Sequence, residues 1–152
     1  MTGAGCEVWF YHLERTSLDQ ALPDLLEKCL ARGWRALVVT AAPDRLAHLD
    51  GWLWTYRDDS FLPHGLASEV EAERQPVLLS TEADNLNHAE ALFLIDGAEA
   101  DRVDGFQRCV DMFDGRDEVA LTAARNRWKA AKAKGLSISY WRQGPRGWEK
   151  QA

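Results

Sequence analysis

The fold is decided by the stretch Arg35-Ala36-Leu37-Val38-Val39-Thr40 at residues 35–40. Its central residues are apolar without a break, which is typical of a strand buried on both faces of a sheet. Residues 18–32 before it place leucines at helical spacing, with Thr16 or Ser17 as the cap and Gly33 as the end, so they predict a helix. Residues 8–13 predict an earlier strand. This order of strand, helix and strand predicts a parallel sheet and an α/β fold.

The remaining elements follow from similar patterns. Pro43 suits a first helical turn, so a second helix is predicted from there to about residue 54. A long helix is predicted over 117–134, ending at Gly135. The other predicted segments are strands over 76–80, 91–96, 108–113 and 136–141, a loop over 56–75 and a short helix over about 101–106. We expect one domain over 1–142, with a largely parallel sheet flanked by helices, and a loose tail over 143–152.

Composition narrows the class of protein. The chain has 152 residues, 46% of them apolar and 28% charged, which is an ordinary globular balance. The net charge of −6 makes direct binding of duplex DNA a poor hypothesis. Residues 1–115 carry a net −12 and residues 116–152 a net +6, so the basic end suits an anionic partner. The apolar runs are too short to span a membrane, and we expect a cytoplasmic protein with reduced, mostly buried cysteines.

The chemistry of common active sites is missing from the sequence. The first strand-to-helix turn, residues 13–17, has no glycine, although a dinucleotide fingerprint requires glycines there. We found no phosphate-binding loop, no hydrolase elbow and no histidine spacing typical of a metal site. His64 lies in a loop, and Asp58 and Asp59 could form a carboxylate pair, but neither pattern is specific. We therefore predict no catalytic residues, no cofactor and no metal. A nucleotide- or phosphate-binding enzyme remains the alternative.

An aromatic patch, residues 52–56 together with 61–63, is the first candidate docking surface. Helical spacing cannot bury Trp52, Trp54 and Tyr56 on one side, so part of this aromatic surface should be exposed. Exposed rings and a proline in a loop suit a partner interface. Alternatively, the loop folds back and the rings fill a satellite core. A structural subunit of some other complex could also use this patch.

The long helix over 117–134 is the second candidate. At 100° per residue, five alanines gather on one side: Ala120, Ala123, Ala124, Ala130 and Ala131. Arg125, Lys129 and Lys132 gather on another side, and Leu121 and Trp128 lie between the two stripes. The alternative is a solvated face whose late cations complement the helix dipole. A tryptophan beside clustered cations favours binding of an anionic partner.

Several short motifs, in order, resemble a known family. They are Phe10-Tyr11-His12-Leu13, Leu49-Asp50, Leu53-Trp54, Ser60-Phe61-Leu62-Pro63-His64, Leu66-Ala67, Pro76-Val77, Val110-Asp111 and Ala124-Arg125-Asn126-Arg127-Trp128-Lys129. Together they resemble the chi subunit of bacterial DNA polymerase III, an accessory protein of the clamp loader. The resemblance implies a Rossmann-like fold with no nucleotide site and no catalytic activity of its own.

The resemblance also implies two partners. Chi subunits bind the acidic C-terminal tail of single-stranded-DNA-binding protein, and in some bacteria also the psi subunit. By position, the tail-binding residues are Arg125, Trp128, Lys129 and Lys132, and we expect Phe113 to help close that pocket. The psi-like surface is Trp54, Phe61, Leu62 and Pro63. Arg127 matches the family motif but falls on the alanine side, where a buried ion pair would explain it. No membrane partner is expected.

Overall fold

The computed structural model describes residues 6–56, 62–100, 103 and 105–152. Its helices are α1 (Leu18–Ala31), α2 (Pro43–Thr55) and α3 (Glu118–Ala133), with a short 3₁₀ turn, η2, at Ala72–Arg74. Its strands are β1 (Glu7–Leu13), β2 (Ala36–Val39), β3 (Gly65–Leu66), β4 (Val77–Ser80), β5 (Ala91–Ile95), β6 (Arg108–Asp114), β7 (Ser137–Gly144) and β8 (Gly147–Lys150).

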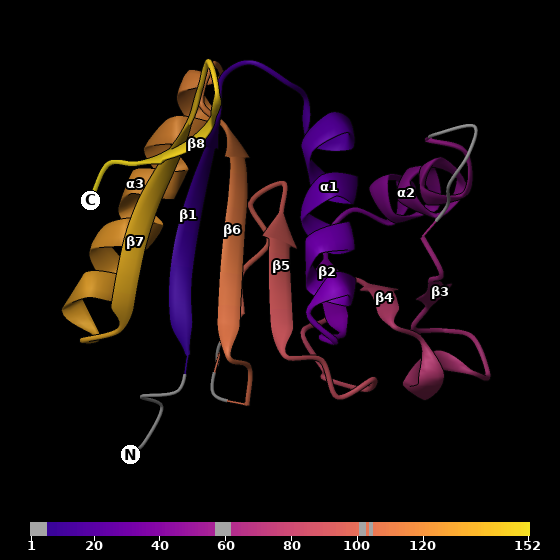
Figure 1. The fold of residues 1–152 in the computed structure, drawn as a ribbon. Coiled ribbons are helices and arrows are strands. Elements are labelled where there is room, and N and C mark those ends of the chain that lie inside the picture. The colour runs from indigo at the N-terminus through magenta and orange to yellow at the C-terminus, as the bar shows by residue number, and fades with distance from the viewer. Residues whose placement is uncertain (1–5, 57–61, 101–102, 104) are drawn as a thin grey trace.

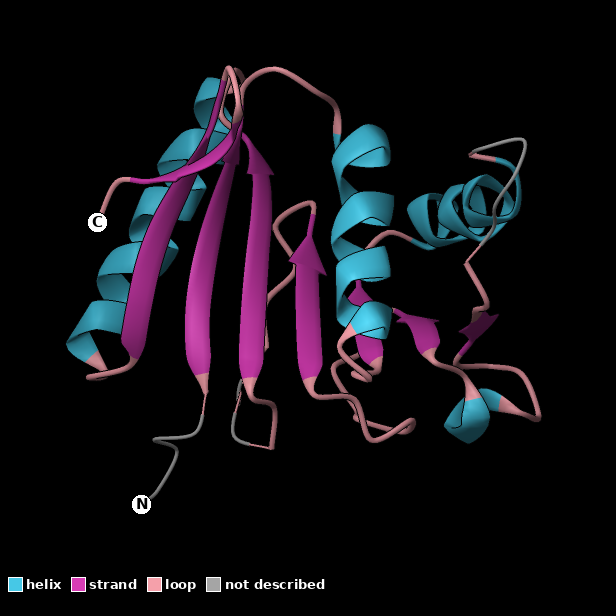
Figure 2. Ribbon diagram, in the orientation of Figure 1, coloured by secondary structure: helices cyan, strands magenta, loops and turns pink. Residues whose placement is uncertain are grey.

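The strands form one sheet in the order β3-β4-β2-β5-β6-β1-β7-β8 (Figures 1 and 2). All neighbouring pairs run parallel except β7 and β8, which are antiparallel. Figure 2 shows α3 behind the sheet and α1 in front of it. The predicted α/β, Rossmann-like architecture is confirmed. None of the helices in the described ranges combines the length and apolarity needed to cross a membrane.

Two apolar layers, one on each face of the sheet, hold the elements together. One layer packs α1 and α2 against alternate residues of the strands, and Leu22, Leu26 and Leu53 are fully buried in it. The other layer packs α3 against the opposite side chains, such as Phe10. All four residues of β2 are buried, which confirms the interpretation of 35–40 as a doubly covered strand.

Most predicted elements are present within a residue or two at each end. Ser17 caps α1 through a capping box, and Gly33 after the helix has the positive φ of 81° that favours glycine. The segment 56–75, expected to be a loop, also contains β3 and η2. Of the short helix expected at about 101–106, residues 101, 102 and 104 lie outside the described part, and the other three are not helical.

The expected loose tail over 143–152 is wrong. Strand β7 continues to Gly144, and Gly147, with a φ of 122°, supports the turn into β8. The Trp148 ring lies 4.4 Å from the ring of Tyr11, so the hairpin covers apolar surface on the sheet. Gln151 then donates a backbone hydrogen bond to the Tyr140 carbonyl. Partial burial of the Trp148 indole against the sheet favours an ordered hairpin.

Candidate functional site

Helix α3 is held on the sheet by a cap, small residues and an ion pair. The Asp117 carboxylate accepts hydrogen bonds from two backbone N–H groups of the first turn. Ala124 and Ala131 are buried, as the alanine stripe predicts, whereas Ala130 is exposed. Arg127 donates to both carboxylate oxygens of Asp111 on β6, at 2.6 and 2.9 Å. The buried ion pair suggested for Arg127 is thus confirmed.

A pocket of about 390 Å³ opens between α3 and β7. We call it the α3–β7 pocket; its lining residues are His12, Arg125, Trp128, Tyr140, Arg142, Gln151 and Ala152. The Trp128 ring packs edge-on against Phe10 and Tyr140, with centroids 5.5 and 5.7 Å away. These contacts hold the indole in place in a pocket that is also lined by two cations from different elements, Arg125 on α3 and Arg142 on β7. Such a pocket offers an apolar wall and guanidinium donors to a ligand that carries both a ring and a carboxylate.

A polar network lies behind the pocket wall. His12 Nδ1 shares a hydrogen bond of 2.7 Å with the Tyr140 hydroxyl, and its Nε2 lies 3.2 Å from Glu14. Arg142 is 2.6 Å from the same Glu14 oxygen. Burial lowers the pKa of His12, and the charges of Arg142 and Arg125 add to this effect while Glu14 opposes it. The network therefore positions Tyr140 and Arg142, while burial favours the neutral imidazole.

The predicted tail-binding residues are only partly brought together. Arg125 and Trp128 line the α3–β7 pocket, whereas Lys129 and Lys132 are exposed elsewhere on α3 and do not line it. Phe113 does not close the pocket, because it is only 4% exposed and packs behind the wall against His12 and Tyr140. That expectation is wrong.

Sequence reasoning missed the contributions of His12, Tyr140 and Arg142. Tyr140 and Arg142 alternate with Trp141 on β7, so both point to the α3 side of the sheet. The alternation was visible in the sequence. The sequence does not reveal that β1 pairs in parallel with β7. This pairing places His12 directly opposite Arg142 in the register.

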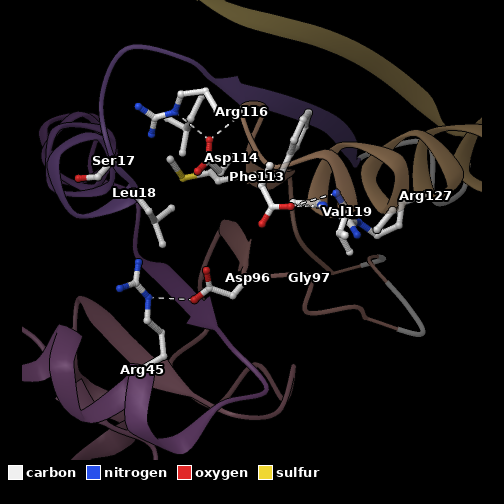
Figure 3. Close-up of a pocket in the computed structure, with 15 residues that line it drawn as sticks. Ser17, Leu18, Arg45, Asp96, Gly97, Phe113, Asp114, Arg116, Val119 and Arg127 are labelled. Atoms are coloured by element: carbon white, nitrogen blue, oxygen red, sulfur yellow. Dashed lines mark hydrogen bonds and ion pairs between the residues drawn. The ribbon is translucent and has the colours of Figure 1, made fainter.

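A larger cavity, of about 560 Å³, lies at the edge where β1, β5 and β6 end (Figure 3). Open α/β sheets bind nucleotides at this edge. Here each arginine that lines the cavity already has a carboxylate partner: Arg45 pairs with Asp96, Arg116 with Asp114 and Arg127 with Asp111. The carboxylates of Asp96, Asp114 and Asp117 also line it, and they would repel a phosphate.

The turn from β1 to α1 is blocked by a side chain. The backbone N–H groups of Glu14, Arg15 and Thr16 all donate to Gln143 Oε1, at 2.9, 2.8 and 3.1 Å. In nucleotide-binding relatives of this architecture, the N–H groups of this turn approach a phosphate. In this chain a side-chain oxygen from β7 accepts them instead. The arrangement agrees with the lack of glycine in the turn and argues against the nucleotide-binding enzyme at this edge.

The aromatic patch is partly core and partly exposed. Trp54 is 50% exposed, and Pro63 is also exposed. Leu62 is only 2% exposed and belongs to the core, so its assignment to the docking surface is wrong. Phe61 lies outside the described residues. Trp52 and Tyr56 are half-buried; Trp52 donates to the backbone carbonyl of Asp19 at 2.6 Å, as the satellite-core alternative predicts.

The loop histidine has a structural role. The buried His64 ring lies 2.6 Å from the Leu62 carbonyl and 2.9 Å from the Asp50 carbonyl, which ties the loop to α2. The pair Asp58 and Asp59 lies outside the described residues. All three cysteines, Cys6, Cys29 and Cys109, are buried. Across the described ranges, no cluster of three or more histidine, cysteine or carboxylate side chains could hold a metal ion.

Comparison with known proteins places the chain in a family. Residues 6–139 match the family model described as "DNA polymerase III chi subunit, HolC". The DNA polymerase III subunit chi of Pseudomonas aeruginosa is 30% identical over 115 residues, which cover 75% of this chain and 78% of that protein. The "Probable DNA polymerase III subunit chi" of Rickettsia prowazekii is 29% identical over 85 residues, which cover 56% of this chain and 52%, about half, of that protein. The chain belongs to the DNA polymerase III chi subunit family, and so to the accessory subunits of the replicative polymerase.

Proposed function

We propose that this chain is a non-catalytic clamp-loader subunit that binds the acidic C-terminal tail of single-stranded-DNA-binding protein in the α3–β7 pocket. Binding there would link the polymerase complex to template coated by that protein. One observation carries the proposal: Arg125 on α3 and Arg142 on β7 line the same pocket as Trp128 and Tyr140.

The ligand implied by the family resemblance has a terminal carboxylate beside an apolar ring, preceded by further acidic residues. Arg125 is exposed on α3, so its guanidinium can form a bidentate pair with the carboxylate. Trp128 and Tyr140 supply the wall for the ring. Lys129 and Lys132, which are exposed on the same helix, would attract the upstream acidic residues from outside the pocket.

Arg142 is the second cation in the pocket, and it is already paired with Glu14. An incoming carboxylate would therefore share Arg142 with Glu14, whereas the pocket-lining Arg125 has no ion pair to a described residue. We expect Arg125 to contribute more to affinity than Arg142 for this reason. Exposed charges are screened over about 8 Å at physiological ionic strength, so the affinity should fall as salt rises.

The test is titration of a fluorescently labelled tail peptide, followed by fluorescence anisotropy. Arg125→Glu should weaken binding by roughly 2 kcal/mol or more, as loss of an interface anchor does. Lys134→Glu is the matched control, because it makes the same charge change at an exposed position at the end of the same helix. Lys129→Glu should have an intermediate effect, since Lys129 lies outside the pocket. If Arg125→Glu binds the peptide as tightly as wild type, the tail does not bind in this pocket.

A second partner, a psi subunit or another clamp-loader component, is proposed for the exposed part of the aromatic patch. The Trp54 ring is half exposed and lies 4.6 Å from the ring of His64, which the Leu62 and Asp50 carbonyls hold in place. A positioned, half-exposed indole suits an interface anchor, and Pro63, next to His64 in the chain, is exposed as well. Trp54→Ala should abolish capture of clamp-loader components from the native cell while leaving tail binding unchanged. Unchanged capture would contradict this second assignment.

A further inference from the structure

A third pocket, of about 280 Å³, lies on the α1 side of the sheet, near the edge where β1, β5 and β6 begin. In Figure 1 this is the lower edge of the sheet, where α1 ends. Aromatic rings of Trp9, Tyr11, Phe93 and Trp148 form much of its wall. Three cations, Lys28, Arg32 and Arg108, complete the charged part of the lining, which contains no carboxylate among the described residues. The Glu7 carboxylate accepts a hydrogen bond from the Trp9 indole at 3.0 Å, but Glu7 does not line the pocket.

Arg108 is the most informative of these residues. Its guanidinium lies 3.8 Å from the centre of the Trp9 ring and 5.2 Å from that of Trp34. Its Nε is buried and has no hydrogen-bond partner, and no ion pair links the guanidinium to any residue in the described ranges. A partly buried guanidinium that no described carboxylate neutralises is stabilised by an anionic ligand. The two indoles orient this guanidinium beside the pocket that it lines.

The neighbouring cations are not needed to complete the end of α1. The carbonyls of Lys28, Cys29 and Leu30 already accept hydrogen bonds from the backbone N–H groups of residues 32–34. Both Lys28 and Arg32 are exposed, and the Arg32 guanidinium lies 4.0 Å from the Trp34 ring centre. Their side chains are therefore available to the same anion as Arg108.

We infer that this pocket binds a nucleotide unit, with a phosphate at Arg108, Arg32 and Lys28 and a planar base against the aromatic wall. Guanidinium groups match phosphate oxygens in bidentate geometry, and three cations suit the near-double charge of a phosphate better than one carboxylate. Flat bases pack favourably on aromatic side chains. The inference is independent of the proposed peptide site, which lies on the other face of the sheet.

The experiment measures tryptophan fluorescence of the full chain, since Trp9 and Trp34 flank Arg108. Thymidine monophosphate, thymidine, a 5′-phosphorylated oligothymidylate and an acidic peptide are titrated separately. Thymidine monophosphate should quench the fluorescence saturably, and thymidine should bind at least about tenfold more weakly because it lacks the charged group. The relative affinities of the mononucleotide and the oligonucleotide show whether the pocket prefers a free nucleotide or a nucleotide at the end of a single strand.

Arg108→Gln should weaken binding of the nucleotide at least about tenfold. Arg146→Gln, which makes the same charge change at an exposed residue outside the pocket, should leave binding unchanged. Lys28→Gln, at an exposed position, is a second test if Arg108→Gln fails to fold, and it should also weaken binding. The inference is overturned if neither nucleotide binds at millimolar concentrations, if thymidine binds equally well, if the pocket variants bind like wild type, or if only the acidic peptide binds.

Discussion

Replacing Arg127 by methionine should destabilise the protein strongly, because it leaves Asp111 alone in the interior. Only 5% of the Asp111 side chain and 14% of the Arg127 side chain are exposed, and the two hydrogen bonds between them are short. Methionine keeps much of the volume and removes the charge. The pair joins α3 to β6, so it also positions the helix that carries Arg125 and Trp128.

The size of the loss follows from the cost of neutralising the carboxylate. Protonating a carboxyl of ordinary pKa costs about 4 kcal/mol at pH 7, since each pKa unit is worth about 1.36 kcal/mol. Burial already raises the pKa of Asp111, although Arg127 opposes this, so the actual cost lies below that bound. Breaking a buried ion pair commonly costs roughly 3–5 kcal/mol. We therefore expect Arg127→Met to lower the free energy of unfolding by about 2–4 kcal/mol at pH 7.

Urea unfolding at two pH values tests this reasoning. The difference between Arg127→Met and wild type should shrink by up to about 2.7 kcal/mol at pH 5, because the isolated carboxyl is then easier to protonate. Arg116→Met is the matched control: it breaks the exposed pair with Asp114, whose side chains are 51% and 48% exposed, and should cost less than about 1 kcal/mol. The role of a buried, unpaired Asp111 would be refuted if Arg127→Met lost no more unfolding free energy than Arg116→Met, or if its loss were the same at both pH values.

Three further predictions concern the same elements. Gly115→Ala should lower the free energy of unfolding by roughly 1–3 kcal/mol in urea titrations, because a Cβ there would lie 1.8 Å from His12 Nε2. An unchanged free energy of unfolding would mean that the imidazole moves aside freely. The free energy of unfolding should fall as the pH is lowered from about 7.5 to 5.5, because burial lowers the pKa of His12 and the unfolded chain therefore binds the proton first. The fall should be smaller in His12→Asn, and an equal fall would rule out His12 as its cause. Trp54→Ala should barely change the melting temperature, whereas Leu53→Ala, at a fully buried position, should cost roughly 2–5 kcal/mol; equal losses would place Trp54 in the core.

The sequence predicts the central elements well because their signals are local. The apolar run at 36–39 is typical of a strand covered on both sides, and Gly33 ends the preceding helix through its own backbone. The hairpin after β7 was missed because its signal is tertiary. The short polar segment around Trp148 packs its indole on Tyr11, which lies more than a hundred residues earlier in the sequence.

The residues of the candidate site also differ in whether a local pattern in the sequence identifies them. Arg125 and Trp128 could be identified from helical angles, because both lie on α3. Lys129 lies on that helix too, but its exclusion from the pocket depends on how α3 sits against β7. Arg142 could not be assigned, since its approach to the pocket requires β7 to pair with β1. Leu62 looked like its exposed neighbour Pro63 because burial within a loop leaves no periodic pattern.

Strand β7 explains why the turn from β1 to α1 does not offer the usual phosphate site of this architecture. Because side chains alternate along a strand, Gln143 points to the α1 side, where its oxygen accepts the three N–H groups that a phosphate would otherwise meet. Tyr140 and Arg142 point to the other side and build the α3–β7 pocket. One strand thus fills the nucleotide position and forms a wall of the pocket on the opposite face. A Gln143→Ala variant should therefore free the turn without altering the wall, and peptide binding should survive it as long as the hairpin remains paired.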